Sequence, residues 1–88
     1  MIIIETTIFT RRIKSALSEE DYRELQNYLV ENPSIGKLIK GTGGLRKLRW
    51  GGSGRGKRGG SRIIYYWQKD NEIILMLFIF QKNESDFK

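Results

Sequence analysis

The stretch RIIYYWQKDNEIILMLFIF, residues 62–80, decides the fold of this chain. Two apolar segments rich in β-branched and aromatic residues lie on either side of a short polar turn, KDN at 69–71. Apolar segments bounded by turn residues are typical of β-strands, and a short turn joins antiparallel neighbours. The pattern therefore predicts paired strands at 62–68 and 72–80.

The second of these strands is apolar on both of its faces. Odd and even positions from 73 to 80 are all apolar, whereas a strand with one solvent-exposed face alternates between apolar and polar residues. We therefore expect residues 72–80 to form an inner strand whose two faces are both covered.

A third strand is predicted upstream, at 45–50. The sequence LRKLRW places Lys47 and Arg49 on one face and Leu48 and Trp50 on the other, because side chains alternate along a strand. One face of this strand is thus basic and the other apolar. With the two strands above, it completes a three-stranded antiparallel meander.

The N-terminal part of the chain predicts one strand and two helices. An apolar, β-branched start indicates a strand at 2–8, and TRRIKSAL at 10–17 is a candidate for a short helix. Ser18 stands three residues before Asp21, as a helix N-cap does, and apolar residues follow at helical spacing. The sequence thus predicts a helix at 18–31.

These elements predict an α+β fold in the order β-α-α-β-β-β, as a single domain over residues 1–88 with an antiparallel sheet. The two N-terminal helices are expected to pack on one face of the sheet, which leaves the other face without a helix. Either a binding partner or a C-terminal helix that this sequence lacks would then cover that face.

Positive charge is concentrated in one segment. The chain of 88 residues has a net charge of +6, and residues 36–62 contain nine Lys or Arg, no Asp or Glu, and all 10 glycines. Most acids lie instead at 19–31 and near the C-terminal end. Such a lopsided distribution of charge favours association with a polyanion such as nucleic acid.

The residue types that the chain lacks exclude several kinds of site. Without Cys there are no disulfides and no thiolate metal ligands, and without His as well, a Ser-His-Asp triad is excluded and a conventional zinc site is not expected. The acids form no evident cluster for magnesium. We expect no metal and no cofactor.

The sequence predicts neither a membrane-spanning nor a secreted protein. Its longest apolar run, 73–80, has eight residues, whereas a membrane-spanning helix needs about 20. The N-terminal segment reaches Glu5 without a preceding basic region, unlike a secretory signal. We therefore expect a cytoplasmic protein with no membrane partner.

The glycine-rich segment contains two misleading phosphate-loop patterns. GGSGRGKR at 51–58 matches the Walker spacing except at Arg58, and Gly54, Gly56 and Gly59 satisfy G-x-G-x-x-G. Both motifs need a helix directly afterwards, whereas a strand is predicted here. We therefore discount nucleotide binding.

Any catalysis by this chain has to use Arg, Lys or Tyr side chains. These groups titrate at about 10 or above, so they are poor general bases, but guanidinium groups hold phosphate well. RNA suits such a site because its own 2′-hydroxyl is a nucleophile next to the phosphate. Tyr65, Tyr66 and Trp67 could stack bases, although filling the core is the more ordinary role, above all for Trp67.

Three segments give the chain a resemblance to a known family. NPSIGKLIKGTGGLRKLRW at 32–50, GKRGGSRIIYYW at 56–67 and LFIFQKNESD at 77–86 together resemble the RelE/HigB toxins of bacterial toxin–antitoxin pairs, the HigB branch in particular. The likeness covers nearly the whole chain in order, and the RelE-like fold has the element order predicted above. The family normally continues into a C-terminal helix that this sequence apparently lacks.

The resemblance implies a ribosome-dependent mRNA endonuclease that cleaves by metal-independent attack of the 2′-hydroxyl. It implies that Lys47 and Arg49 orient the RNA backbone and that Arg62 stabilises the phosphate, with Lys82 as a fourth catalytic candidate. Further candidates for binding RNA, ribosomal RNA included, are Arg46, Arg55, Lys57 and Arg58. A cognate antitoxin, expected to be of the helix-turn-helix type, would hold the toxin inactive and carry any contact with operator DNA.

Departures from the family pattern keep alternatives open. The RelE branch has an arginine and then a tyrosine after the last strand, where this chain has Asn83 and Phe87. With the sequence ending at Lys88, the chain could instead be a truncated or degenerate toxin fold that binds antitoxin or RNA without cleaving it. A plain basic nucleic-acid-binding domain is a third hypothesis.

Overall fold

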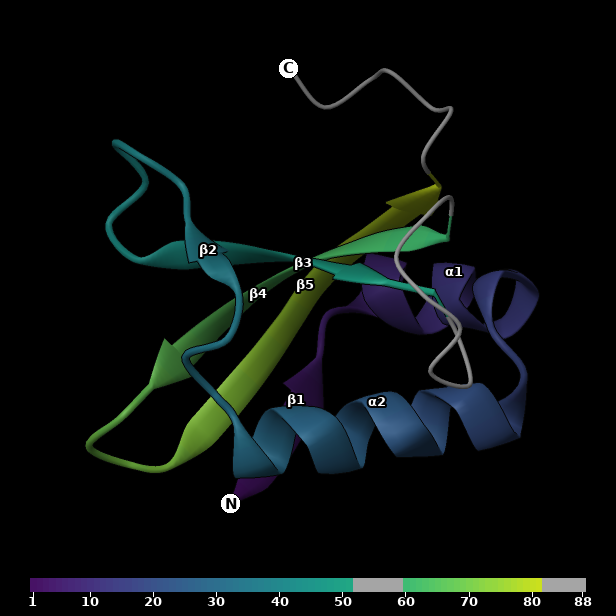
Figure 1. The fold of residues 1–88 in the computed structure, drawn as a ribbon, viewed down its shortest axis with the longest axis horizontal. Helices are drawn as coiled ribbons and strands as arrows, with labels where there is room; N and C mark the ends of the chain where they lie inside the picture. The colour runs from purple at the N-terminus through teal and green to yellow at the C-terminus, as the bar shows by residue number, and fades with distance from the viewer. Residues whose placement is uncertain (52–59, 82–88) are drawn as a thin grey trace.

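The computed structural model describes residues 1–51 and 60–81, whose fold is drawn in Figure 1. Along the chain the elements are β1 (Ile2–Glu5), α1 (Thr7–Ala16), α2 (Glu19–Glu31), β2 (Lys37–Leu38), β3 (Leu45–Trp50), β4 (Ser61–Gln68) and β5 (Ile73–Gln81). The five strands form one sheet in the order β1-β5-β4-β3-β2. The predicted α+β class is confirmed.

The last three strands form the predicted antiparallel meander. β3 pairs with β4 and β4 with β5, both antiparallel, and every strand end lies within one residue of its predicted position. Glu72 has a positive φ of 54° at the end of the turn, so β5 begins one residue later than expected. β5 lies between β1 and β4, as an inner strand should.

The first strand departs from the predicted sheet. β1 pairs parallel with β5, so the expectation of an antiparallel sheet holds for β2 to β5 and not for β1. Parallel neighbours require a long crossover connection, and here the chain runs through both helices and three strands between them. No local pattern in the sequence could indicate this pairing.

The strand predicted at 2–8 is also shorter than expected, since β1 ends at Glu5 and its last predicted residues belong to a cap and to α1. The reason is Thr6, whose Oγ1 accepts a hydrogen bond from the Phe9 amide at 3.1 Å and donates one to the Leu77 carbonyl at 2.9 Å. A threonine cap of this kind starts a helix even within a β-branched sequence.

The second helix is confirmed. Ser18 is the N-cap of α2, and its Oγ accepts a hydrogen bond from the Asp21 amide at 3.0 Å. Acidic residues in the first turn favour the helix dipole, and Leu25 and Leu29, one turn apart, are fully buried. Neither α1 nor α2, the helices of the described residues, has the length and apolar character needed to cross a membrane.

Both helices pack on the same face of the sheet, as Figure 1 shows. The core consists of Phe9 and Ile13 from α1, Leu25 and Leu29 from α2, and Ile63, Tyr65, Ile74, Met76 and Ile79 from β4 and β5. Within residues 1–51 and 60–81, no helix covers the opposite face. We call that opposite side of the sheet the open face.

Candidate nucleic-acid interface

Strand register shows which side chains lie on the open face. On β3 and β4, the register pairs are Arg49 with Arg62, Lys47 with Ile64, and Leu45 with Tyr66. Because Ile63 and Tyr65 are buried in the helix-covered core, their neighbours along β4 point to the open face. The alternation predicted for β3 agrees, since Leu48 and Trp50 pack against the core.

Two pairs of like charges face each other across neighbouring strands. Arg49 pairs with Arg62 between β3 and β4, and Lys37 pairs with Lys47 between β2 and β3. Lys37, Lys47 and Arg49 are exposed, and Arg62 is half-buried. Like charges directly opposite each other on a sheet are destabilising, so their grouping favours a role in binding an anion. We call these four residues the cation strip.

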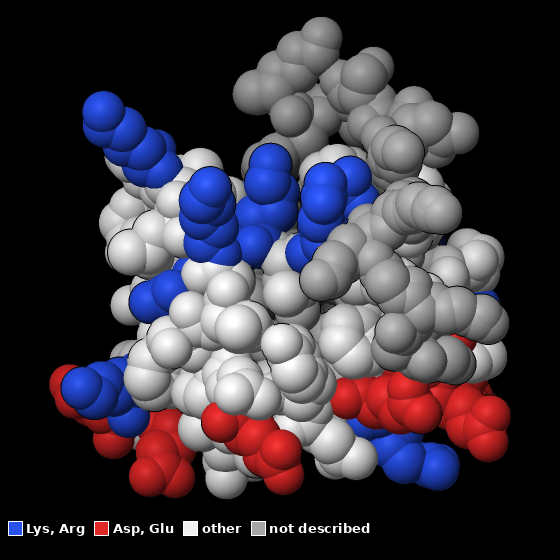
Figure 2. Space-filling model, in the orientation of Figure 1, with Lys and Arg blue, Asp and Glu red and all other residues white. Residues whose placement is uncertain are grey.

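The charges of the molecule separate in space as they do in the sequence. In Figure 2, most Lys and Arg lie over the upper part, where β2 and β3 lie, and Asp and Glu lie along the lower rim, beside α2, with a few Lys or Arg among them. The acids at the start of α2 are Glu19, Glu20 and Asp21. A basic surface opposite an acidic one orients an approaching polyanion toward the strip.

The three consecutive aromatic residues of β4 divide between the two faces. Tyr65 is buried, and its hydroxyl donates to the Pro33 carbonyl and accepts from the Gly36 amide, both at 2.8 Å. Burial raises the pKa of Tyr65 above its usual value, so the hydroxyl stays protonated. Trp67 packs against the core, as expected. Tyr66 is half-buried on the open face, where its ring could stack on a base.

Arg46 lies on the helix-covered side, away from the cation strip. Its register partner in β4 is Tyr65. Its guanidinium Nη1 donates to the Ser34 carbonyl at 2.9 Å and to the Gly36 carbonyl at 2.8 Å. These bonds hold the segment before β2 against the sheet, which is a structural contribution.

Lys37 belongs to the cation strip but is not among the site residues expected from the sequence. β2 has only two residues, and a strand that short has no periodicity by which the sequence could indicate it. The one available signal was the density of basic residues across 36–62.

Several sequence candidates lie outside the described residues. These are Arg55, Lys57, Arg58 and Lys82, together with Asn83 and Phe87. Their roles stay predictions. The strand β4 begins at Ser61, where a phosphate-binding motif would need a helix, and this agrees with the discounting of nucleotide binding.

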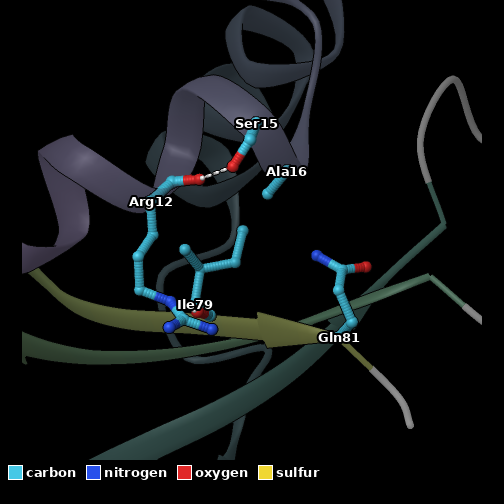
Figure 3. Close-up of a pocket in the computed structure, with 5 residues that line it drawn as sticks. All are labelled: Arg12, Ser15, Ala16, Ile79 and Gln81. Carbon is cyan, nitrogen blue, oxygen red and sulfur yellow. Dashed lines mark hydrogen bonds between the residues drawn. The ribbon is translucent and has the colours of Figure 1, made fainter. Parts of the chain in front are cut away.

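A cavity of about 320 Å³ lies where α1 meets the end of β5 (Figure 3). Its lining residues are Arg12, Ser15, Ala16, Ile79 and Gln81. Arg12 Nε donates to the Ile79 carbonyl at 2.7 Å, and Ser15 Oγ donates to the Arg12 carbonyl at 3.3 Å. The Arg12 guanidinium also lies 4.7 Å from the centroid of the Phe78 ring. These contacts hold the Arg12 side chain against β5.

The cation strip can bind phosphate and stabilise negative charge. Guanidinium groups form paired hydrogen bonds with phosphate oxygens, and lysine ammonium groups act as point charges. Across residues 1–51 and 60–81, no three Asp, Glu, His or Cys side chains gather where they could hold a metal ion. Guanidinium and ammonium groups of this kind can position an anionic backbone and stabilise its charge.

Comparison with solved structures identifies the fold. The chain is similar to the E. coli toxin RelE, solved as a double arginine-to-alanine mutant in complex with an antitoxin RelBc peptide, with a TM-score of 0.67. The match covers 96% of this chain and 84% of that chain. The chain has the RelE fold. Sequence identity is 15%, so the likeness to RelE is one of fold. No protein-family model matches the chain.

Proposed function

We propose that this chain is the toxin of a toxin–antitoxin pair, of the HigB branch, and that it cleaves mRNA on the ribosome. One observation carries the proposal, namely the two cross-strand pairs of like charge on the open face of a RelE fold. Like charges directly opposite each other on a sheet are unfavourable, and both pairs are suited to a phosphate backbone.

In the proposed reaction the RNA supplies its own nucleophile. The 2′-hydroxyl gives its proton to solvent and attacks the adjacent phosphorus, and the bond from phosphorus to the 5′-oxygen breaks. The 5′-oxygen takes up a proton from solvent, so the products are a 2′,3′-cyclic phosphate and a 5′-hydroxyl. No metal or cofactor takes part in this scheme.

The residues of the proposed site divide the tasks of the reaction among them. Arg49 and Arg62 bind the non-bridging oxygens and stabilise the added charge of the pentacoordinate transition state. Lys47 holds the backbone so that the attacking and leaving oxygens lie in line. Tyr66 offers its ring to a base, and Lys82 is the fourth catalytic candidate.

The ribosome completes the proposed site by presenting an ordered mRNA. The candidates for binding ribosomal RNA are Arg55, Lys57 and Arg58. Phosphate contacts of this kind add affinity that falls as salt rises and that carries no sequence information. Single substitutions among these three residues should therefore have small effects.

An antitoxin is the proposed partner. The RelE of the similar structure is in complex with an antitoxin peptide. On this chain, Ile2 and Ile4 pair with Ile73 and Leu75 of β5 and are 60% and 43% exposed. A segment that is partly apolar and partly acidic would complement both this apolar edge and the strip. We further propose that the antitoxin is of the helix-turn-helix type, that it alone contacts operator DNA, and that the pair acts in the cytoplasm.

The test is a cell-free translation reaction to which the purified chain is added. Primer extension maps the 5′ ends of the mRNA, and a parallel reaction lacks ribosomes. We expect cuts in phase with codons, dependent on ribosomes, lost in Arg62→Ala and retained in Arg23→Ala, which removes an exposed arginine of α2. End analysis should find the cyclic phosphate.

The same reaction separates the alternatives. Folded protein that binds RNA in a salt-sensitive way without producing cuts would identify a non-catalytic binding module instead. Cuts without ribosomes would contradict the ribosome-dependent scheme, and cuts that persist in Arg62→Ala would remove that residue from the chemistry.

A further inference from the structure

Lys37 extends the cation strip to the edge of the sheet. β2 is the last strand in the sheet order, and in it Lys37 lies opposite Lys47 of β3. Both side chains are exposed, and neither strand contains an acid that would offset the pair. Such an arrangement is unfavourable for the sheet, which points to an anionic ligand between the two lysines.

The backbone around Lys37 is held in place on both sides. The preceding residue, Gly36, donates its amide to the Tyr65 hydroxyl at 2.8 Å, and its carbonyl accepts from Arg46 at 2.8 Å. A Cβ on Gly36 would lie 2.7 Å from a ring carbon of Tyr65, so glycine is required for this close approach. After β2, the Ile39 amide donates to a β3 carbonyl at 2.8 Å. Lys37 therefore projects from a fixed point of the sheet.

The spacing of the β3 members of the two cation pairs matches an extended nucleic-acid strand. Lys47 and Arg49 are two residues apart on one face of β3, hence about 6.8 Å apart along the strand, which rises about 3.4 Å per residue. One nucleotide repeat of an extended single strand has a similar length. The two pairs are thus placed to hold two consecutive phosphates.

We propose that Lys37 and Lys47 bind the phosphate next to the one held by Arg49 and Arg62. The inference rests on the proposed action on RNA and adds Lys37 to it as a substrate-binding residue. The ligand of the strip is then an extended single strand of RNA with two successive phosphates. Because such contacts read the backbone, this part of the site is indifferent to base sequence.

The test measures binding of a fluorescein-labelled 2′-O-methyl RNA hexanucleotide by anisotropy at a series of salt concentrations. The blocked 2′-hydroxyl prevents cleavage, so binding is measured alone. For a single strand, log K falls with log salt by a slope of about 0.7 per phosphate contacted. Lys37→Ala should reduce this slope by about 0.7, as should Lys47→Ala, whereas Lys37→Arg should retain it.

Lys69→Ala is the matched control, because Lys69 is an exposed lysine in the turn between β4 and β5. It should leave the slope unchanged. A slope that is also unchanged in Lys37→Ala would overturn the assignment, and so would a wild-type chain that binds without salt dependence. Equal binding of a poly-glutamate peptide, lost in Lys37→Ala, would overturn it in favour of a protein ligand.

The two experiments distinguish a failure of the proposed nuclease activity from a failure of the Lys37 contact. A reduced slope in Lys37→Ala, together with no cuts in the translation reaction, would support the second phosphate contact and count against cleavage. Codon-phased cuts, together with an unchanged slope in Lys37→Ala, would support cleavage and count against the second phosphate contact.

Discussion

The two faces of the β3–β4 pair are built from the same strands and differ in what their residues do. On the helix-covered face, Ile63 and Tyr65 are fully buried, and the Tyr65 hydroxyl has both an acceptor and a donor. On the open face, Arg62 and Lys47 each lie opposite another cation. Adjacent residues of one strand thus stabilise the fold on one side and, in our proposal, bind RNA on the other.

The difference between the two faces shows how the fold accommodates an unfavourable arrangement of charge. A directly opposed pair of like charges costs about 0.2–1 kcal/mol, whereas burying one large apolar side chain contributes about 1.5–3 kcal/mol. The stabilising free energy of the core is therefore larger than the cost of the like-charge pairs in the strip. Substitutions on the two faces should consequently change stability in opposite directions.

The largest effect is expected from breaking the helix-covered face at Phe9. This side chain is fully buried and packs against the Tyr22 ring, with the centroids 5.9 Å apart. Phe9→Ala should lower the free energy of unfolding by about 3–5 kcal/mol, because it removes buried area and leaves a cavity. Urea denaturation followed by tryptophan fluorescence measures the change.

Ile8→Ala is the control for that substitution, since Ile8 precedes Phe9 in α1 and is 44% exposed. It should change the free energy of unfolding by much less. Equal losses at the two positions would mean that the burial difference between them does not govern stability.

A smaller effect of opposite sign is expected on the open face. Lys47→Gln removes one charge opposite Lys37 and should raise the free energy of unfolding by about 0.2–1 kcal/mol at low salt. High salt should shrink the gain, because exposed charges are screened. Arg23→Gln, which removes a cation from acidic α2, should not raise the free energy of unfolding. An equal rise in this variant would mean that net charge, and not the pairing of Lys47 with Lys37, explains the effect.

The last expected effect is confined to alkaline pH and comes from the titration of Tyr22. Burial, and then its hydrogen bond to Glu5 at 2.5 Å, raise the pKa of Tyr22 well above its usual range. The unfolded chain releases this proton at about pH 10 while the folded chain retains it, so stability is full below pH 10 and falls as pH rises further. Tyr22→Phe should make that fall shallower in urea denaturation between pH 9 and 11. Parallel profiles for the two proteins would contradict the shift.

Local features of the sequence were enough to predict most of the secondary structure. Alternation separated Lys47 and Arg49 from Leu48 and Trp50, and both the Ser18 cap and the polar turn at 69–71 predicted element ends to within a residue. These signals involve neighbours in the chain, so they can be recognised without knowledge of the fold. Thr6 is the exception, because its cap competes with a β-branched run that favours a strand.

The candidate site could be predicted only in part. Its cations follow from composition and alternation, but Lys37 lies in a strand too short to have a pattern. For Arg46, charge suggested RNA binding but gave no sign that its guanidinium bonds to the carbonyls of Ser34 and Gly36, and its role in binding RNA stays a prediction. Charge alone does not say which face of a strand a residue occupies or what it contacts.

By itself, the sequence determined the class of the fold, the strands of the meander and the concentration of cations near its glycines. Only the tertiary structure decided that Arg49 faces Arg62, that Lys37 faces Lys47, and that β1 runs parallel to β5. The physical reason is the range of the interactions. Alternation and capping arise between residues close in the chain, whereas register is set by packing of distant segments against a shared core.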